Sequence, residues 1–173
     1  REALGRGDGT LASALATALH AADQADLLQL LDPQERAGLV RSLGEALDPE
    51  TLSYLDEDVR DEVIDQLGPS ATGAVLAQLD TDDAVEVIED LDAEEQAAIL
   101  AALPRPERAL IETALAFPEE SAGRLMQREV VAMPGHWTVG QAIDHLRAAP
   151  GLPDEFYDIF IVDPRFHPVA AVP

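Results

Sequence analysis

The stretch from residue 19 to residue 115 decides the fold, and one of its blocks, residues 80–91, reads DTDDAVEVIEDL. Each block is twelve residues long and ends in a leucine. The leucines in register are Leu19, Leu31, Leu43, Leu55, Leu67, Leu79, Leu91, Leu103 and Leu115. A spacing this regular is very improbable by chance, and it indicates an internal repeat.

Each block predicts one short helix followed by a turn. Eight and nine residues after each leucine the chain is again mostly apolar, as at Val87 and Ile88 after Leu79. With the next leucine these positions have the spacing i, i+1, i+4, which is one stripe of a helix. Start signals agree, because Asp32-Pro33 supplies an N-cap acid and a proline at the first helical position. Helices of about two turns are unstable alone, so we expect them to stack as an α-solenoid.

The pattern changes after residue 128. Two β-rich runs, Val130–Met133 and Phe156–Val162, flank an amphipathic helix that spans Thr138–Arg147, and a short strand follows at Pro168–Val172. This order is β-α-β-β. Its one helix covers only one face of a small sheet, so the unit looks truncated.

The sequence therefore predicts a mainly α-helical chain in three parts. Residues 1–9 are expected to be a disordered tail because they are Gly-rich and charged. Residues 10–127 are expected to form the superhelical array, and residues 128–173 the partial β-α-β-β unit, with a loop at residues 150–153.

Composition excludes several classes of function. The 173 residues carry 34 acids against 11 bases, a formal charge of −23, so the chain should repel nucleic acid and anionic membranes and attract cations or basic partners. It has no cysteine, which removes disulfides and zinc–thiolate sites. No run is long enough for a membrane span, so direct membrane insertion is not expected.

The acids exceed what helix starts require. Many occupy caps or first turns, where a carboxylate is favoured by roughly 0.3–1 kcal/mol, and an acidic surface can also serve solubility alone. The segment between Arg60 and Arg105, however, contains twelve acidic residues and no basic residue. Asp82 and Glu86 are like charges one helical turn apart, which is unfavourable. Such carboxylates need a counter-charge, and as hard oxygen ligands they suit Mg²⁺ or Ca²⁺.

The sequence shows no clear catalytic motif, so we expect that the chain has no catalytic residues and is not an enzyme. Ser121 lies near His136 and His145 in the sequence, but without the pattern around a nucleophile that such a triad needs. Neither common phosphate-binding glycine loop is present.

The acidic helical array is followed by Ala122-Gly123-Arg124-Leu125-Met126 and then by the β-α-β-β unit. In this order of parts the chain resembles the cytosolic part of MgtE-type magnesium transporters. In that family a superhelical N-terminal domain precedes cystathionine-β-synthase-type (CBS) domains and a membrane channel. The resemblance implies that residues 10–127 are the N-terminal domain and that residues 128–173 are a partial CBS domain.

The implied function is Mg²⁺ sensing at the cytoplasmic face of the membrane, with Mg²⁺ bridging acidic faces to favour a closed state. The implied metal ligands are Glu50, Asp82, Glu86 and the backbone carbonyl of Arg124. The implied partners are the remaining CBS and transmembrane domains of the parent transporter, in a homodimer. CBS-side ligands would lie beyond residue 173, so the affinity of this chain for Mg²⁺ should be low, and Mn²⁺ or Co²⁺ remain open as the physiological ion.

Two other functions stay open. The array could be a protein-interaction scaffold that does not depend on divalent ions, since helical arrays present extended binding surfaces. The CBS-type unit could bind an adenine nucleotide, although such sites normally need a complete pair of CBS domains.

Overall fold

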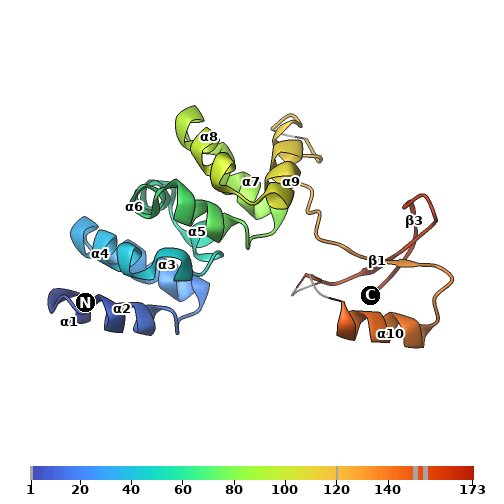
Figure 1. The fold of residues 1–173 in the computed structure, drawn as a ribbon, viewed down its shortest axis with the longest axis horizontal. Helices are drawn as coiled ribbons and strands as arrows, with labels where there is room; N and C mark the ends of the chain where they lie inside the picture. Colours follow the sequence, from blue (N-terminus) through green and yellow to red (C-terminus); the bar gives the residue numbers. More distant parts are fainter. Residues whose placement is uncertain (1, 120, 150–151, 154–155) are drawn as a thin grey trace. The chain divides into compact units, whose positions relative to one another are not determined.

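The computed structural model describes residues 2–119, 121–149, 152–153 and 156–173. It divides into two compact units, Arg1–Met126 and Gln127–Pro173. Glu120 and residues 150–151 of the expected loop lie outside the described residues. The predicted fold class, mainly α with a small sheet at the end of the chain, is confirmed (Figure 1).

The first unit is built of short helices. In chain order they are α1 (Glu2–Gly5), α2 (Gly9–Ala16), α3 (Ala21–Leu30), α4 (Pro33–Leu43), the 3₁₀ turn η1 (Gly44–Ala46), α5 (Thr51–Tyr54), α6 (Glu57–Leu76), α7 (Thr81–Glu89), α8 (Ala93–Ala102) and α9 (Arg105–Leu115).

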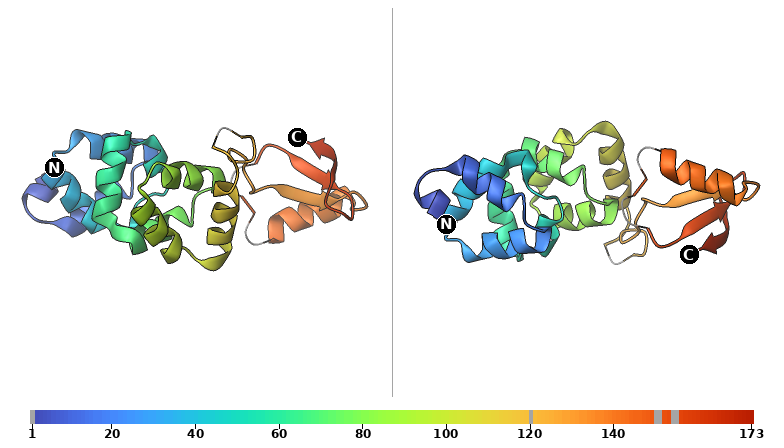
Figure 2. Two further views of the ribbon diagram at one scale, coloured as in Figure 1. Left: turned by 90° about the horizontal axis from the view of Figure 1, so that it is seen from above. Right: turned by 90° about the horizontal axis from the view of Figure 1, so that it is seen from below.

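These helices pack in two rows. From α2 onward each helix contacts the next but one in the chain, so that α2, α4, α6 and α8 follow one another in one row and α3, α5, α7 and α9 in the other. Figures 1 and 2 show the helices succeeding one another in chain order through this unit. This is the geometry of an α-solenoid, in which each short helix is stabilised mainly by its neighbours.

The leucine repeat lies mostly in the core between the rows. Its buried members are Leu31, Leu43, Leu55, Leu91 and Leu103. The apolar pairs inside the blocks are also buried, among them Val63, Ile64, Val75, Leu76, Val87 and Ile88. The exception is Leu19, which is 38% exposed at the start of the repeat. The twelve-residue period thus fixes which face of each helix turns inward.

Aspartates cap the starts of α4 and α8, as the sequence predicts for α4. Asp32 Oδ1 accepts hydrogen bonds from the backbone N–H groups of Gln34 (3.0 Å) and Glu35 (2.9 Å) at the start of α4. Asp92 accepts the equivalent pair at the start of α8. These side chains satisfy helix N–H groups that have no partner within the helix.

Two details of the first unit differ from the sequence expectation. The two blocks that end at Leu67 and Leu79 were each expected to form a helix of their own, but their helices are joined as α6, with a kink at Gly68, where φ is 72°. Residues 1–9 were expected to be a disordered tail, but they contain α1, and Ala3 packs against the core. Asp8 then caps α2 through Leu11 N (3.0 Å), so this end has both a cap and an apolar anchor.

The second unit has the predicted β-α-β-β order. Its elements are β1 (Val131–Pro134), α10 (Val139–Ala148), β2 (Ile159–Val162) and β3 (Pro168–Val172). The strands lie in the order β1-β2-β3, with β1 parallel to β2 and β3 antiparallel to it. Thr138 and Gln141 form a capping box at the start of α10. Because β1 and β2 are parallel, α10 is the crossover between them.

Among the described residues, none of the helices combines the length and the hydropathy that crossing a bilayer requires.

Candidate divalent-cation site

Helix α7 presents the acids that the sequence singled out. Its inner face is formed by Thr81, Ala84, Val85, Val87 and Ile88, all of which are buried. With these residues turned inward, the carboxylates of the helix must lie on its remaining face. The leucine repeat therefore determines the position of the acidic face as well as that of the core.

A cavity of about 360 Å³ lies along this acidic face. Carboxylates from α7 and from the residue after it line the cavity together with Val85, Arg124 and Leu125; the acids are Asp82, Asp83, Glu86, Glu89 and Asp90. The wall formed by residues 124–125 comes from the segment that follows α9. Residues about forty positions apart in the chain thus meet at one site in the first unit.

Asp82 brings an unsatisfied oxygen to this cavity. Its Oδ1 atom is buried and has no hydrogen-bond partner. A buried carboxylate oxygen without a partner is costly, because its lost hydration is not replaced. A cation in the cavity would supply the missing interaction.

The electrostatics of the site point the same way. Burial is the largest cause that raises the pKa of the Asp83 carboxyl above its ordinary value of 3.8. Neighbouring carboxylates raise this pKa further, in the order Asp82, Asp80, Glu86 and Glu50. The four neighbouring carboxylates create a negative potential at Asp83, which disfavours a further negative charge and favours a cation.

Arg124 is the basic residue of the cavity wall. Its side chain is buried, and its Nε lies 3.5 Å from Glu89 Oε2. Nε and Nη1 make no hydrogen bond. The guanidinium therefore neutralises part of the acidic field, although two of its donor nitrogens have no hydrogen-bond acceptor.

A compact turn between α9 and Arg124 fixes the position of Arg124. Its backbone N–H donates to Ser121 O (3.0 Å), and the Ser121 hydroxyl donates to Pro118 O (2.7 Å). A Cβ atom on Gly123 would come within 2.6 Å of the Phe117 ring. Glycine at position 123 thus lets the ring pack directly on the turn.

The family model of the MgtE intracellular N domain matches residues 19–120. The chain belongs to the MgtE intracellular N-domain family. The match covers the whole leucine repeat and α7. It ends four residues before Arg124. The intracellular placement expected from the resemblance agrees with the match.

Two solved structures are similar to nearly the whole chain. A crystal structure of the soluble part of a magnesium transporter is 26% identical, with a TM-score of 0.83 over 99% of this chain and 68% of the other. A crystal structure of the cytosolic domain of the Mg²⁺ channel MgtE in complex with ATP is also 26% identical, with a TM-score of 0.85 over 99% and 70%. Both are parts of magnesium-transport proteins. No curated protein sequence matches the chain.

In this MgtE-family chain, three of the four predicted ligand residues line one cavity. Asp82, Glu86 and Arg124 line it together. Glu50, just before α5, does not line the cavity, and its negative charge is the smallest of the causes that raise the pKa of Asp83. Their role as metal ligands remains a prediction. Within the described part of the chain, no three acidic or histidine side chains lie close enough to hold one ion together, so the carboxylates form an open wall.

Sequence reasoning missed part of this wall. For Arg124 it predicted a role only for the backbone carbonyl and none for the side chain. It also did not single out Asp83, Glu89 or Asp90 as members of the site. The excess of acids between Arg60 and Arg105 called for a counter-charge, but nothing in the spacing shows that a base from residue 124 folds back to α7.

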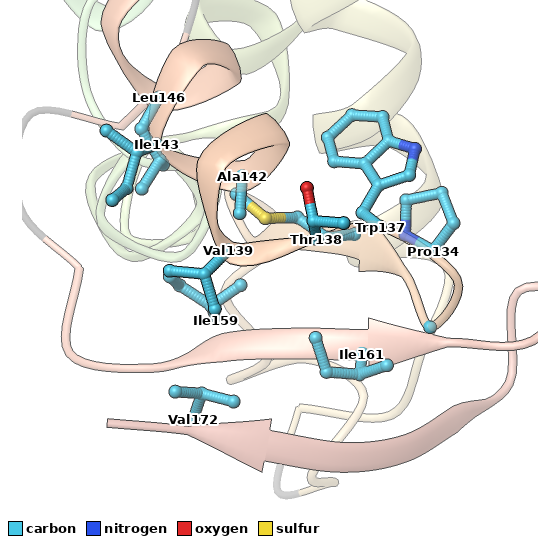
Figure 3. A pocket seen from close by; sticks show the side chains of 12 residues that line it. Pro134, Trp137, Thr138, Val139, Ala142, Ile143, Leu146, Ile159, Ile161 and Val172 are labelled. Carbon is cyan, nitrogen blue, oxygen red and sulfur yellow. The ribbon is translucent and has the colours of Figure 1, made fainter.

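The second unit contains a separate, apolar cavity of about 270 Å³ (Figure 3). It lies between α10 and the sheet, and Trp137, Val139, Ile143 and Ile159 are among the side chains around it. Trp137 also contacts His145 edge to face, with ring centroids 5.1 Å apart. This cavity offers no carboxylate, so it is a different kind of site from the one along α7.

Proposed function

We propose that this chain is the Mg²⁺-sensing cytosolic region of a magnesium transporter or channel, and that the α7 face is where it senses the ion. The observation that carries the proposal is the buried, partnerless Oδ1 of Asp82 in a cavity lined by four further carboxylates. Oxygen ligands of this type suit Mg²⁺, which binds through one or two protein carboxylates and keeps several waters.

The mechanism follows from repulsion between like charges. An acidic wall disfavours the approach of a second acidic surface until divalent ions lie between them. Mg²⁺ therefore favours the compact, closed arrangement over the separated one, by as much as its affinity for the two states differs. Asp82 and Glu86 would contribute carboxylate oxygens, Glu50 would add to the field, and the junction at Arg124 would contribute its backbone carbonyl.

The partners follow from the same proposal. Residues 128–173 would be a partial CBS domain, and the remaining CBS and transmembrane domains of the parent protein, in a homodimer, would supply the facing surface. Because α7 offers only an open wall, Mg²⁺ should bind this chain weakly, and the facing surface should raise the affinity.

Neutralising the wall tests the proposal against the protein-interaction scaffold. In Asp82→Asn/Glu86→Gln, the rise in unfolding temperature that millimolar Mg²⁺ causes in the wild type should be largely lost, because bound ligand stabilises the folded state. The matched control is Glu57→Gln/Asp61→Asn, which removes two exposed carboxylates one turn apart on α6. Its Mg²⁺ response should equal that of the wild type.

Two results would favour the scaffold. One is a wild-type unfolding temperature that Mg²⁺ does not change. The other is an equal response in both double variants, since that would mean the ion acts on the charge of the whole molecule rather than on α7.

A further inference from the structure

The side chain of Arg124 lies in the cavity along the acidic face of α7, where the carboxylates favour a cation. The residue is only 7% exposed, and it lines the same cavity as Asp82 and Glu86. Its ion pair with Glu89 is loose, at 3.5 Å. The guanidinium is thus a positive charge enclosed by the acids of α7.

The contacts of Arg36 show what a saturated buried arginine looks like in this chain. Arg36 donates to Leu28 O (2.9 Å) and Leu31 O (3.2 Å), and it pairs with Glu62. Arg124, by contrast, has no hydrogen bond at Nε or Nη1. A buried guanidinium with unfilled donors is held by the field of the carboxylates rather than by directed bonds, so a competing cation can displace it at less cost.

We infer that Arg124 is a tethered counter-cation of the α7 cavity, which a divalent ion replaces when it binds. Without the ion, the guanidinium compensates part of the repulsion between the carboxylates. With the ion, Asp82 Oδ1 gains a positive partner and the arginine is repelled from the cavity. This inference concerns the regulation of the proposed cation site and rests on that site.

The exchange needs no movement of the backbone. The junction is fixed by the turn at Ser121 and by the contact between Gly123 and the Phe117 ring. The long, flexible stem of an arginine lets its head group leave the cavity while the Cα atom stays in place. Arg124 would then set the ion concentration at which the cavity fills, because each ion has to replace a charge that is already present.

Removing the charge should therefore strengthen ion binding. A unit charge a few ångströms from a divalent ion, even in a water-like dielectric, opposes it enough to change the dissociation constant about tenfold. In Arg124→Gln, the Mg²⁺ concentration at the midpoint of the rise in unfolding temperature should fall about tenfold. The control Arg108→Gln removes an exposed arginine that pairs with Glu112, and it should leave this midpoint unchanged.

The conservative variant separates charge from packing. Arg124→Lys keeps a positive charge on a flexible stem, so its midpoint should stay close to that of the wild type. In the absence of divalent ions, Arg124→Gln should unfold at a lower temperature than Arg108→Gln, and saturating Mg²⁺ should remove the difference. This rescue by the ion is a readout that a purely structural arginine would not give.

The outcomes distinguish this inference from the sensing function. Equal Mg²⁺ midpoints in wild type, Arg124→Gln and Arg124→Lys would overturn the exchange and leave the sensing function standing. Binding by Arg124→Gln with none by the wild type would support the exchange and count against sensing by the native chain. The absence of a Mg²⁺ response in all the variants would overturn both.

Discussion

Asp83 shows how the acidic wall affects individual residues. Burial and neighbouring carboxylates raise the pKa of its side chain above the ordinary value of 3.8. The folded chain therefore binds this proton more tightly than the unfolded chain does. The corresponding stabilisation is fully present below the ordinary value and is lost as the pH rises through the raised pKa of the folded state.

Asp83→Asn should remove this pH dependence. Because the amide carries no charge, the free energy of unfolding of the variant relative to the wild type should increase as the pH rises from below 3.8 to neutrality. Urea unfolding of both proteins at several pH values measures the difference. Glu57→Gln, at an exposed position on α6, serves as the control, and a difference that stayed flat with pH in Asp83→Asn would contradict this account.

At the scale of helices, buried arginines fasten the rows of the solenoid. Arg36 on α4 reaches the last carbonyls of α3 and pairs with Glu62 on α6. Arg60 on α6 pairs with Asp90, just after α7. Each arginine thus joins one block to a later one, and in Arg36 a cation also meets the negative end of a helix.

Arg36→Ala should lower the free energy of unfolding by about 2 kcal/mol, because two backbone carbonyls and a carboxylate lose a charged donor. Urea unfolding followed by far-ultraviolet circular dichroism measures the change. The matched variant is Arg41→Ala, whose exposed side chain makes one hydrogen bond to Gln66 (2.9 Å); its cost should be within a few tenths of a kcal/mol. Equal costs for the two variants would show that the fastening role is wrong.

Helices were the most predictable level of this structure, and the arginines the least. The period-twelve leucines and the Asp32 cap are local signals; they located the start of α4 and the block that contains α7. The join at Gly68 was not predictable, because a glycine followed by proline can either end a helix or kink it. Contacts such as Arg36 with Glu62, or Arg124 with Glu89, span tens of residues, and nothing local specifies them.

In the candidate site, too, the local features could be predicted from the sequence and the long-range contacts could not. The position of Asp82 and Glu86 on one outer face came from helical spacing alone. Their meeting with Arg124 depends on how the chain turns after α9. That turn is held by the hydrogen bonds of Ser121 and by the close approach of Gly123 to the Phe117 ring. The weaker link to Glu50 depends on the packing of α5 beside α7.

For the whole molecule, charge is the dominant physical fact. A formal charge of −23 on 173 residues favours expansion, and the solenoid concentrates part of that charge on α7. Simple salt should weaken this repulsion by screening, whereas an ion that binds between two acidic faces should hold them together. The two effects can be separated by comparing MgCl₂ with NaCl at matched ionic strength.

Small-angle X-ray scattering of the complete cytosolic region of the parent protein tests the central claim most directly. Millimolar Mg²⁺ should reduce its radius of gyration, NaCl at the same ionic strength should reduce it much less, and Asp82→Asn/Glu86→Gln should weaken the Mg²⁺ effect. A radius of gyration that millimolar Mg²⁺ leaves unchanged would contradict the proposal that this chain senses magnesium.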